Sequence, residues 1–332
     1  MKISAACFKD EEINNTIKSS GSDGICEVTN QKSVIVDIED FSDFFSDLLN
    51  IFQESSTSKK SLTQLIQEDW DFFYDESTAN IILSECIKLY RPNFNSQQVE
   101  YIPQISDFIK LWENIKDSLQ HQTRYFTNLG KLYPIDPMLE KYIVADEPIP
   151  KGRTLYRARV LPDKKAYYQK KDMGCPPPEK VNAGRANPVG IPYLYLCADK
   201  DTTYYEVRAR FLDRICIGTF KTVRDLNIVN FADKASLFLS SHSGDIIEFI
   251  KKKLLLNSIS KDMSRPLTRY DSELEYVPTQ YICELSKLHK ANGICFESSL
   301  KKDGLNYVLF DENDADCIDV KNTQIKEVII KA

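Results

Sequence analysis

The spacing of apolar residues changes near the middle of this chain, which limits the fold to two parts of different kinds. In VDIEDFSDFFSDLLNIF (residues 36–52), apolar side chains recur every three or four positions, as on one face of a helix. The same period recurs over 105–119, and Ser61 is a suitable cap for another helix over 62–70. The first half is therefore predicted to be an α-helical domain.

The second half has short runs of β-branched and aromatic residues in place of this period. The segment DEPIPKGRT (146–154) separates the halves with two prolines and a glycine, so we place the domain boundary there. A chain of 332 residues is long enough for two domains. The second domain is predicted to be α+β, with strands at 193–197, 215–220, 226–231, 307–310 and part of 320–330, and helices near 236–256 and 278–290.

Composition excludes several classes of protein. The nine cysteines contain no C-x-x-C pair, which is typical of free thiols in a reducing cytosol. The N-terminus lacks the apolar run of a signal peptide, and no segment approaches the ~18 apolar residues of a membrane helix. A net charge of −6 disfavours non-specific nucleic-acid binding. We therefore expect a cytoplasmic protein with no membrane and no specific nucleic-acid partner.

One basic segment stands out in this acidic chain. Residues 151–185 contain ten Lys or Arg against three acids. Such a concentration of positive charge suits an anionic ligand, and the alternative is a solvated loop without a ligand.

The motifs of several large enzyme classes are absent. The chain has no glycine-rich dinucleotide fingerprint, P-loop, zinc-protease motif or G-x-S-x-G. Its three histidines, at 121, 242 and 289, are not spaced as metal ligands, so we expect no metal. Chemistry must therefore depend on Arg, Tyr, Glu and Ser side chains.

The stretch GRANPVGIPYLYL (184–196) is the first candidate for a ligand loop. Glycines allow the backbone to approach a ligand, Asn187 can hold the turn, and the planar guanidinium of Arg185 suits phosphate. The alternative is a surface arginine beside a structural turn. In the following strand, Tyr193 and Tyr195 share one face, opposite two leucines, where a tyrosine could stack on a cationic ring.

Further polar candidates are spread along the second half. Arg157 lies in TLYRAR, an alternating strand in which Tyr156 and Arg157 point to opposite sides. Thr202 or Thr203 is predicted to cap a helix with Glu206 in its first turns, in a partly dry pocket. Thr279 and Gln280 open a later helix, and Ser298 and Ser299 lie in a turn before a strand.

In this order, LYRAR, GRANPVGIPYLYLC, TTYYEVR, YVPTQ and GICFESS followed by NYVLFD resemble the RES domain, a family named for an arginine, a glutamate and a serine. Its members are toxins paired with Xre-type antitoxins. They consume NAD, by cleaving its nicotinamide–ribose bond with water or phosphate or by transferring ADP-ribose to a protein. Their fold is similar to that of ADP-ribosyltransferases. The resemblance implies that residues 148–332 form a RES domain.

The resemblance also implies roles for individual residues. Glu206, Arg157, Arg185 and Ser298 would be catalytic, and NAD would bind as the substrate. Two positions depart from the family pattern: Ala158 follows the first arginine where some relatives have tyrosine, and Phe296-Glu297 precedes the serine in place of Tyr-Pro. A non-catalytic regulator that binds NAD, ADP-ribose or a partner protein is the alternative of another class. The residues implied in NAD binding are Tyr156, Tyr195, Asn187, Thr279 and Gln280.

The first half resembles the HEPN-like helical domain that precedes some RES domains. Residues 1–30 resemble a zinc ribbon in which Ser4-x-x-Cys7 and Cys26-x-x-Thr29 replace two C-x-x-C pairs. Two thiolates are a poor zinc site, so we expect a hairpin without the metal. Residues 31–147 would be a HEPN-like scaffold or recognition domain, because His121 lacks the preceding arginine of a HEPN ribonuclease.

Overall fold

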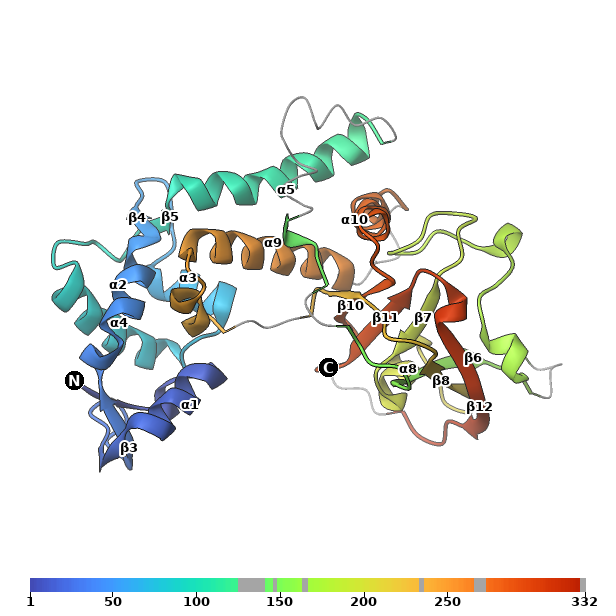
Figure 1. Ribbon diagram of the computed structural model, residues 1–332, viewed down its shortest axis with the longest axis horizontal. Helices are drawn as coiled ribbons and strands as arrows, with labels where there is room; N and C mark the ends of the chain where they lie inside the picture. Colours follow the sequence, from blue (N-terminus) through green and yellow to red (C-terminus); the bar gives the residue numbers. More distant parts are fainter. Residues whose placement is uncertain (125–140, 146–147, 163–166, 233–235, 266–272, 329–332) are drawn as a thin grey trace. The chain divides into compact units, whose positions relative to one another are not determined.

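The computed structural model describes the chain except for residues 125–140, 146–147, 163–166, 233–235, 266–272 and 329–332 (Figure 1). The chain divides into two compact units that are not contiguous in sequence. Residues 1–112 and 234–255 form the first unit, and residues 113–233 and 256–332 form the second. The expected boundary at 146–154 lies partly outside the described residues.

The first unit is largely helical, as predicted. It contains α1 (Glu11–Ser20), α2 (Ser42–Asn50), α3 (Leu62–Trp70) and α4 (Glu76–Tyr90). The helices α5 (Pro103–His121) and α9 (Ile246–Ser264) begin in this unit and end in the second. Ser61 caps α3 as expected, since its hydroxyl accepts from the Gln64 amide at 3.2 Å.

Five short strands occur in this unit, and apart from the hairpin expected within residues 1–30 they were not predicted. The strands β1 (Lys2–Ser4), β3 (Lys32–Asp37) and β2 (Ser22–Ile25) form one antiparallel sheet in that order, and β4 (Phe52–Glu54) pairs with β5 (Val99–Tyr101). The helix expected over 36–52 is therefore shorter, because β3 occupies its start and β4 its last residue. Strands this short carry too few alternating positions to be distinguished from loops by pattern.

The segment that resembles a zinc ribbon, residues 1–30, extends from β1 through α1 and β2 to the turn before β3. Cys7 and Cys26 are fully buried, and their Sγ atoms lie 3.7 Å apart as free thiols. Burial acts to raise the pKa of Cys26, but the nearby polar groups of Ser4 and Thr29 outweigh it and lower the pKa to about 7. The four positions singled out from the sequence therefore meet in space.

The second unit contains a seven-stranded sheet, so the fold class is α+β as predicted. The strand order is β12-β8-β6-β7-β11-β10-β9, and every pairing is antiparallel except that of β9 with β10. The bounds are β6 (Thr154–Val160), β7 (Leu194–Cys197), β8 (Arg214–Thr222), β9 (Ile228–Asn230), β10 (Gly293–Glu297), β11 (Leu305–Leu309) and β12 (Ala315–Gln324).

Two elements of this unit position the site. The helix α8 (Lys200–Glu206) follows β7 directly and packs against β6, and α10 (Val277–Leu288) precedes β10. The strand β6 contributes to both faces of the sheet: Leu155 packs in one apolar cluster, and Ala158 packs with Ile215 and Ile217 in another. Arg157 therefore lies on the face opposite to Tyr156 and Ala158, as the alternation predicts.

Candidate active site

The second unit contains a cavity of about 450 Å³ that is lined by several elements distant in sequence. Strands β6, β7 and β11, helix α8, the loop at 184–187 and the last residues of α9 contribute to its lining. Six of the nine site residues predicted from the sequence line it: Tyr156, Arg157, Arg185, Asn187, Tyr195 and Glu206. Ser298, Thr279 and Gln280 do not line it, but each donates a hydrogen bond to a residue that does.

Glu206 is the last residue of α8, which corrects the prediction that it lies in the first turns. Asp199 is the cap in place of Thr202 or Thr203, because its side chain accepts from the Thr202 amide at 2.9 Å and from the Thr202 hydroxyl at 2.7 Å. The helix therefore starts earlier than expected. Glu206 is also exposed, where a partly dry pocket was predicted.

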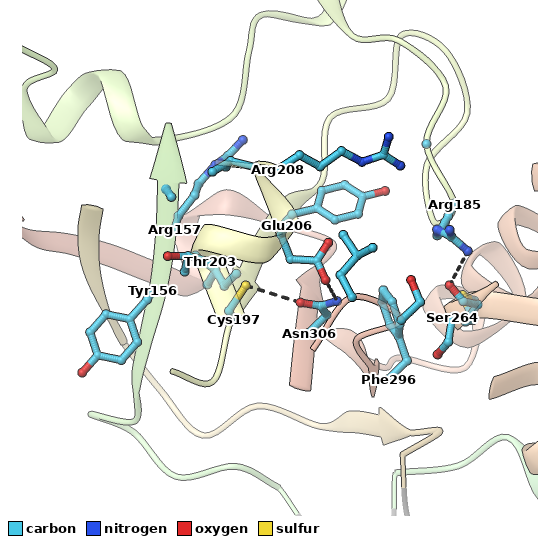
Figure 2. A pocket seen from close by; sticks show the side chains of 18 of the residues that line it. Tyr156, Arg157, Arg185, Cys197, Thr203, Glu206, Arg208, Ser264, Phe296 and Asn306 are labelled. Atoms are coloured by element: carbon cyan, nitrogen blue, oxygen red, sulfur yellow. Dashed lines mark hydrogen bonds between the residues drawn. The ribbon is translucent and has the colours of Figure 1, made fainter. Parts of the chain in front are cut away.

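Two side chains hold the Glu206 carboxylate by the same oxygen. Asn306 Nδ2 and Ser298 Oγ each donate to Glu206 Oε1 at 2.7 Å. Figure 2 shows the carboxylate pointing toward Asn306. Within the described part of the chain, Oε2 accepts no hydrogen bond, which leaves it available to a ligand.

Ser298 supports the carboxylate from within a tight turn. Its hydroxyl accepts from the amides of Leu300 and Lys301, each at 3.2 Å, while it donates to Glu206. The neighbouring Ser299 and Leu300 line the cavity. In this structure the Ser298 hydroxyl is bonded to Glu206, which itself lines the cavity.

The loop at 184–187 is fixed from inside by two polar side chains. Tyr195 Oη donates to Asn187 Oδ1 at 2.7 Å and accepts from the Ala186 amide at 3.2 Å. Asn187 Nδ2 donates to the carbonyls of Asn182 and Pro188, each at 3.1 Å. Burial raises the pKa of Tyr195, so this hydroxyl stays protonated and keeps donating.

Helix α10 holds the same loop from the other side. Thr279 Oγ1 donates to the Arg185 carbonyl at 2.6 Å, and Gln280 Nε2 donates to the carbonyls of Gly184 and Asn187 at 2.8 and 3.0 Å. The structure therefore uses the Thr279 and Gln280 side chains to fix the backbone of the loop, where we had expected ligand contacts.

The Arg185 side chain extends from this loop to the end of α9. Its Nη1 donates to the Met263 carbonyl at 2.8 Å and to the Asp262 carbonyl at 3.5 Å. Carbonyls at a helix C-terminus carry partial negative charge and attract a cation. Burial lowers the pKa of Arg185, and the helix end compensates for the desolvated charge.

Arg157 occupies the other side of the cavity. Its Nη1 donates to the Gly174 carbonyl at 3.1 Å, and Arg159 Nη2 donates to the same oxygen at 2.6 Å. Burial and the charge of Arg159 lower the pKa of Arg157 to about 10, which still leaves it charged at neutral pH. In Figure 2 the Tyr156 ring points away from Glu206, and the Lys200 Nζ lies 5.5 Å from its centroid.

The charges of the lining favour an anion. Its charged side chains are Arg157, Arg185 and Arg208 against the single carboxylate Glu206. Figure 2 shows Arg157 and Arg185 on opposite sides of that carboxylate. A ligand with a diphosphate and a group that develops positive charge would match both kinds of residue.

Sequence reasoning did not assign roles to Asn306, Arg208 or Tyr276, which also line the cavity. The segment NYVLFD begins with Asn306, to which the sequence pattern assigned no function. A polar residue at the start of an otherwise apolar strand is the signal that could have identified Asn306. Arg208 has a φ of 48°, a left-handed conformation directly after α8.

Removing the α8 cap should weaken the site. Burial acts to raise the pKa of Asp199, but bonds from Lys301 and Thr202 lower it to about 2. This carboxylate therefore contributes stability above its ordinary pKa of about 4, and that contribution is lost as pH falls through about 2. We expect Asp199→Ala to cost about 1 kcal/mol, with a lower Tm at pH 7 and a difference that disappears at low pH. A Tm equal to that of the wild type at pH 7 would refute the role of the cap.

Comparison with known proteins identifies the family to which the chain belongs. A family model for the RES domain matches residues 154–329, so the chain belongs to the RES domain family. RES-domain toxins are in general NAD-processing enzymes. The crystal structure of the M. tuberculosis MbcT–MbcA toxin–antitoxin complex contains a chain with 13% sequence identity and a TM-score of 0.33, and the match covers 56% of this chain and 92% of that one. No curated protein matches.

Two further properties bear on cofactors and membranes. Among the residues that the structure describes, no group of three or more His, Cys, Asp or Glu side chains is placed to hold a metal ion. Within the same ranges, no helix combines the length and apolar character needed to cross a bilayer.

Proposed function

We propose that this chain cleaves the bond between nicotinamide and ribose in NAD⁺. The observation that carries the proposal is the meeting of one fixed carboxylate with three arginines in a single cavity. A volume of about 450 Å³ lies within the usual range of ~300–1,000 Å³ for small-molecule sites. The family's general action on NAD is consistent with both features.

The arginines would bind the diphosphate of NAD. Arg185 is fixed at its base by the loop and at its tip by α9, so little side-chain entropy would be lost when it meets a phosphate. Arg157 and Arg208 would neutralise the remaining charge from the other side. Tyr195, whose hydroxyl is held within the loop, would present a fixed ring to the nicotinamide.

Glu206 would act on the reacting ribose. Breaking the N-glycosidic bond builds positive charge on the ribose, as in glycoside hydrolysis. A carboxylate held in place by Asn306 and Ser298 stabilises that charge without reorganising during the reaction. The leaving group is neutral nicotinamide, so the reaction needs no strong general acid, and the lining contains no histidine.

The acceptor of the ADP-ribosyl group is water or inorganic phosphate in this proposal. Purified protein should be incubated with NAD⁺ with and without phosphate, and the products separated by chromatography and weighed by mass spectrometry. Release of nicotinamide with ADP-ribose identifies a glycohydrolase, and ADP-ribose 1″-phosphate identifies a phosphorylase. Nicotinamide release only with added protein, which gains ADP-ribose, identifies an ADP-ribosyltransferase. Intact NAD⁺ under all conditions, together with a saturable thermal shift, would indicate that the chain binds NAD⁺ without catalysing a reaction.

We further propose that the activity is that of a cytoplasmic toxin controlled by an antitoxin of the Xre-like kind. Family membership supports this proposal. Residues 31–147, with their HEPN-like sequence pattern, would serve as a scaffold or recognition part. Expression of the chain alone should deplete cellular NAD and arrest growth, and growth arrest without NAD loss would contradict the proposal.

A further inference from the structure

The Asn306 side chain lies between Cys197 and Glu206 and forms a hydrogen bond with each of them. Asn306 is the second residue of β11, and its backbone pairs directly with that of Cys197 in β7. Both side chains are almost fully buried, with exposed fractions of 8% for Asn306 and 6% for Cys197. A buried amide at this position must satisfy its donor and its acceptor within the protein.

The two ends of the Asn306 amide have different partners. Cys197 Sγ donates to Asn306 Oδ1 at 3.3 Å, and Asn306 Nδ2 donates to Glu206 Oε1 at 2.7 Å (Figure 2). Burial raises the pKa of Cys197 to about 12, so the thiol keeps its proton and remains a donor. A thiol that can donate to Oδ1 favours the orientation in which the NH₂ group faces the carboxylate.

We propose that Asn306, oriented by Cys197, is a positioning residue that fixes Glu206 for the cleavage step. The inference rests on the proposed function and adds a residue that the family's arginine, glutamate and serine do not include. Ser298 sits in a turn of its own, whereas Asn306 belongs to β11, a strand that is paired on both sides, so it couples the carboxylate to the interior of the sheet.

Asn306→Asp is the most informative variant, because it keeps the shape of the side chain and removes the NH₂ group. Two carboxyl groups about 3 Å apart cannot both ionise without strong repulsion, so they share a proton at low pH. The charged groups around the pair are Arg157, Arg185 and Arg208 of the lining, together with the ion pair of Asp199 and Lys301, whose charges act on Cys197. We expect kcat to fall by about tenfold to a hundredfold at pH 8, with little change in KM, and to recover as pH is lowered.

A second pair tests the role of the thiol. Cys197→Ser keeps a donor for Oδ1 and should retain most of the activity, whereas Cys197→Ala removes it and should lower kcat several-fold. The chain offers a matched control on the opposite part of the sheet, where Cys216 donates to Asn322 at 2.7 Å and the two residues are paired between β8 and β12. Asn322→Asp should leave kcat and its pH profile unchanged, because neither residue lines the cavity.

An Asn306→Asp protein with wild-type kcat and pH profile would overturn the inference while the proposed function stands. If Asn306→Asp does not fold, as judged by circular dichroism, equal kcat values for Cys197→Ser and Cys197→Ala overturn it instead. A wild type that releases no nicotinamide overturns the proposed function. The inference is then tested by crystal structures: Glu206 should keep its position in Cys197→Ser and leave it in Asn306→Ala, and an unmoved Glu206 in Asn306→Ala refutes the positioning role.

Discussion

Replacing Glu206 by glutamine should lower the rate of nicotinamide release by about a hundredfold to a thousandfold, with a small effect on KM. Glutamine can still accept from Asn306 and Ser298 through its oxygen, so the geometry is retained while the negative charge is lost. Only the stabilisation of the positive ribose is removed, and that stabilisation exists in the transition state alone. The measurement is initial-rate nicotinamide release over a range of NAD⁺ concentrations.

Asp201→Asn is a suitable control for this substitution. Asp201 is an exposed acid on the same helix, α8, and it does not line the cavity. Its substitution removes one negative charge from α8 and should leave the rate unchanged. A Glu206→Gln protein with the wild-type Tm and the wild-type rate would rule out the assigned role.

Gly184→Ala should disrupt the arginine loop and lower kcat/KM by about tenfold or more. A Cβ at this position would lie 2.6 Å from Asn187 Oδ1 and 2.8 Å from Tyr195 Oη, closer than such atoms approach. These two atoms form a hydrogen bond with each other. The added methyl group therefore cannot be accommodated without breaking the hydrogen bond that fixes the loop. Arg185 would then lose its alignment toward a phosphate, and substrate affinity would fall with it.

Val189→Ala tests whether any change in this loop is harmful. Val189 is 67% exposed, so its truncation should affect neither Tm nor turnover. Adding Tyr195→Phe to Gly184→Ala removes one of the two close contacts, so the double variant should have a higher Tm than Gly184→Ala alone. Wild-type kcat/KM for Gly184→Ala alone would mean that the loop does not hold a ligand-binding arginine.

Local patterns predicted several of the larger elements of the fold, although α4 was missed and the helix expected near 236–256 is α9, Ile246–Ser264. The period over 105–119 marks a helix because apolar residues at that spacing can be buried on one side only, and α5 spans Pro103–His121. The alternation around Tyr195 likewise predicts β7. The short strands of the first unit and β10 were missed, because each has only three to six residues and owes its pairing to distant segments.

The positions of the site residues were less predictable than their identities. Glu206 was placed near a helix start because Thr202 and Thr203 can cap helices, but the carboxylate of Asp199 competes for the same amide. Thr279 and Gln280 are more than 90 residues from the loop that they hold, so no local pattern reveals the contact.

The role of the basic segment at 151–185 was likewise only partly predictable from the sequence. Of the cations in this segment that the structure describes, only Arg157 and Arg185 line the cavity, while Lys170, Lys171 and Lys180 are exposed. The solvated-loop alternative therefore describes these three lysines, and the ligand interpretation is restricted to the two arginines. Lys164 and Lys165 lie outside the described residues.

A crystal structure of the Glu206→Gln protein with NAD⁺ tests the central claim most directly, because the variant should bind the substrate without consuming it. The account predicts the nicotinamide ribose within hydrogen-bonding distance of residue 206, with the diphosphate beside Arg185 and the nicotinamide against Tyr195. NAD⁺ bound outside this cavity, or bound with its nicotinamide end away from residue 206, would contradict it.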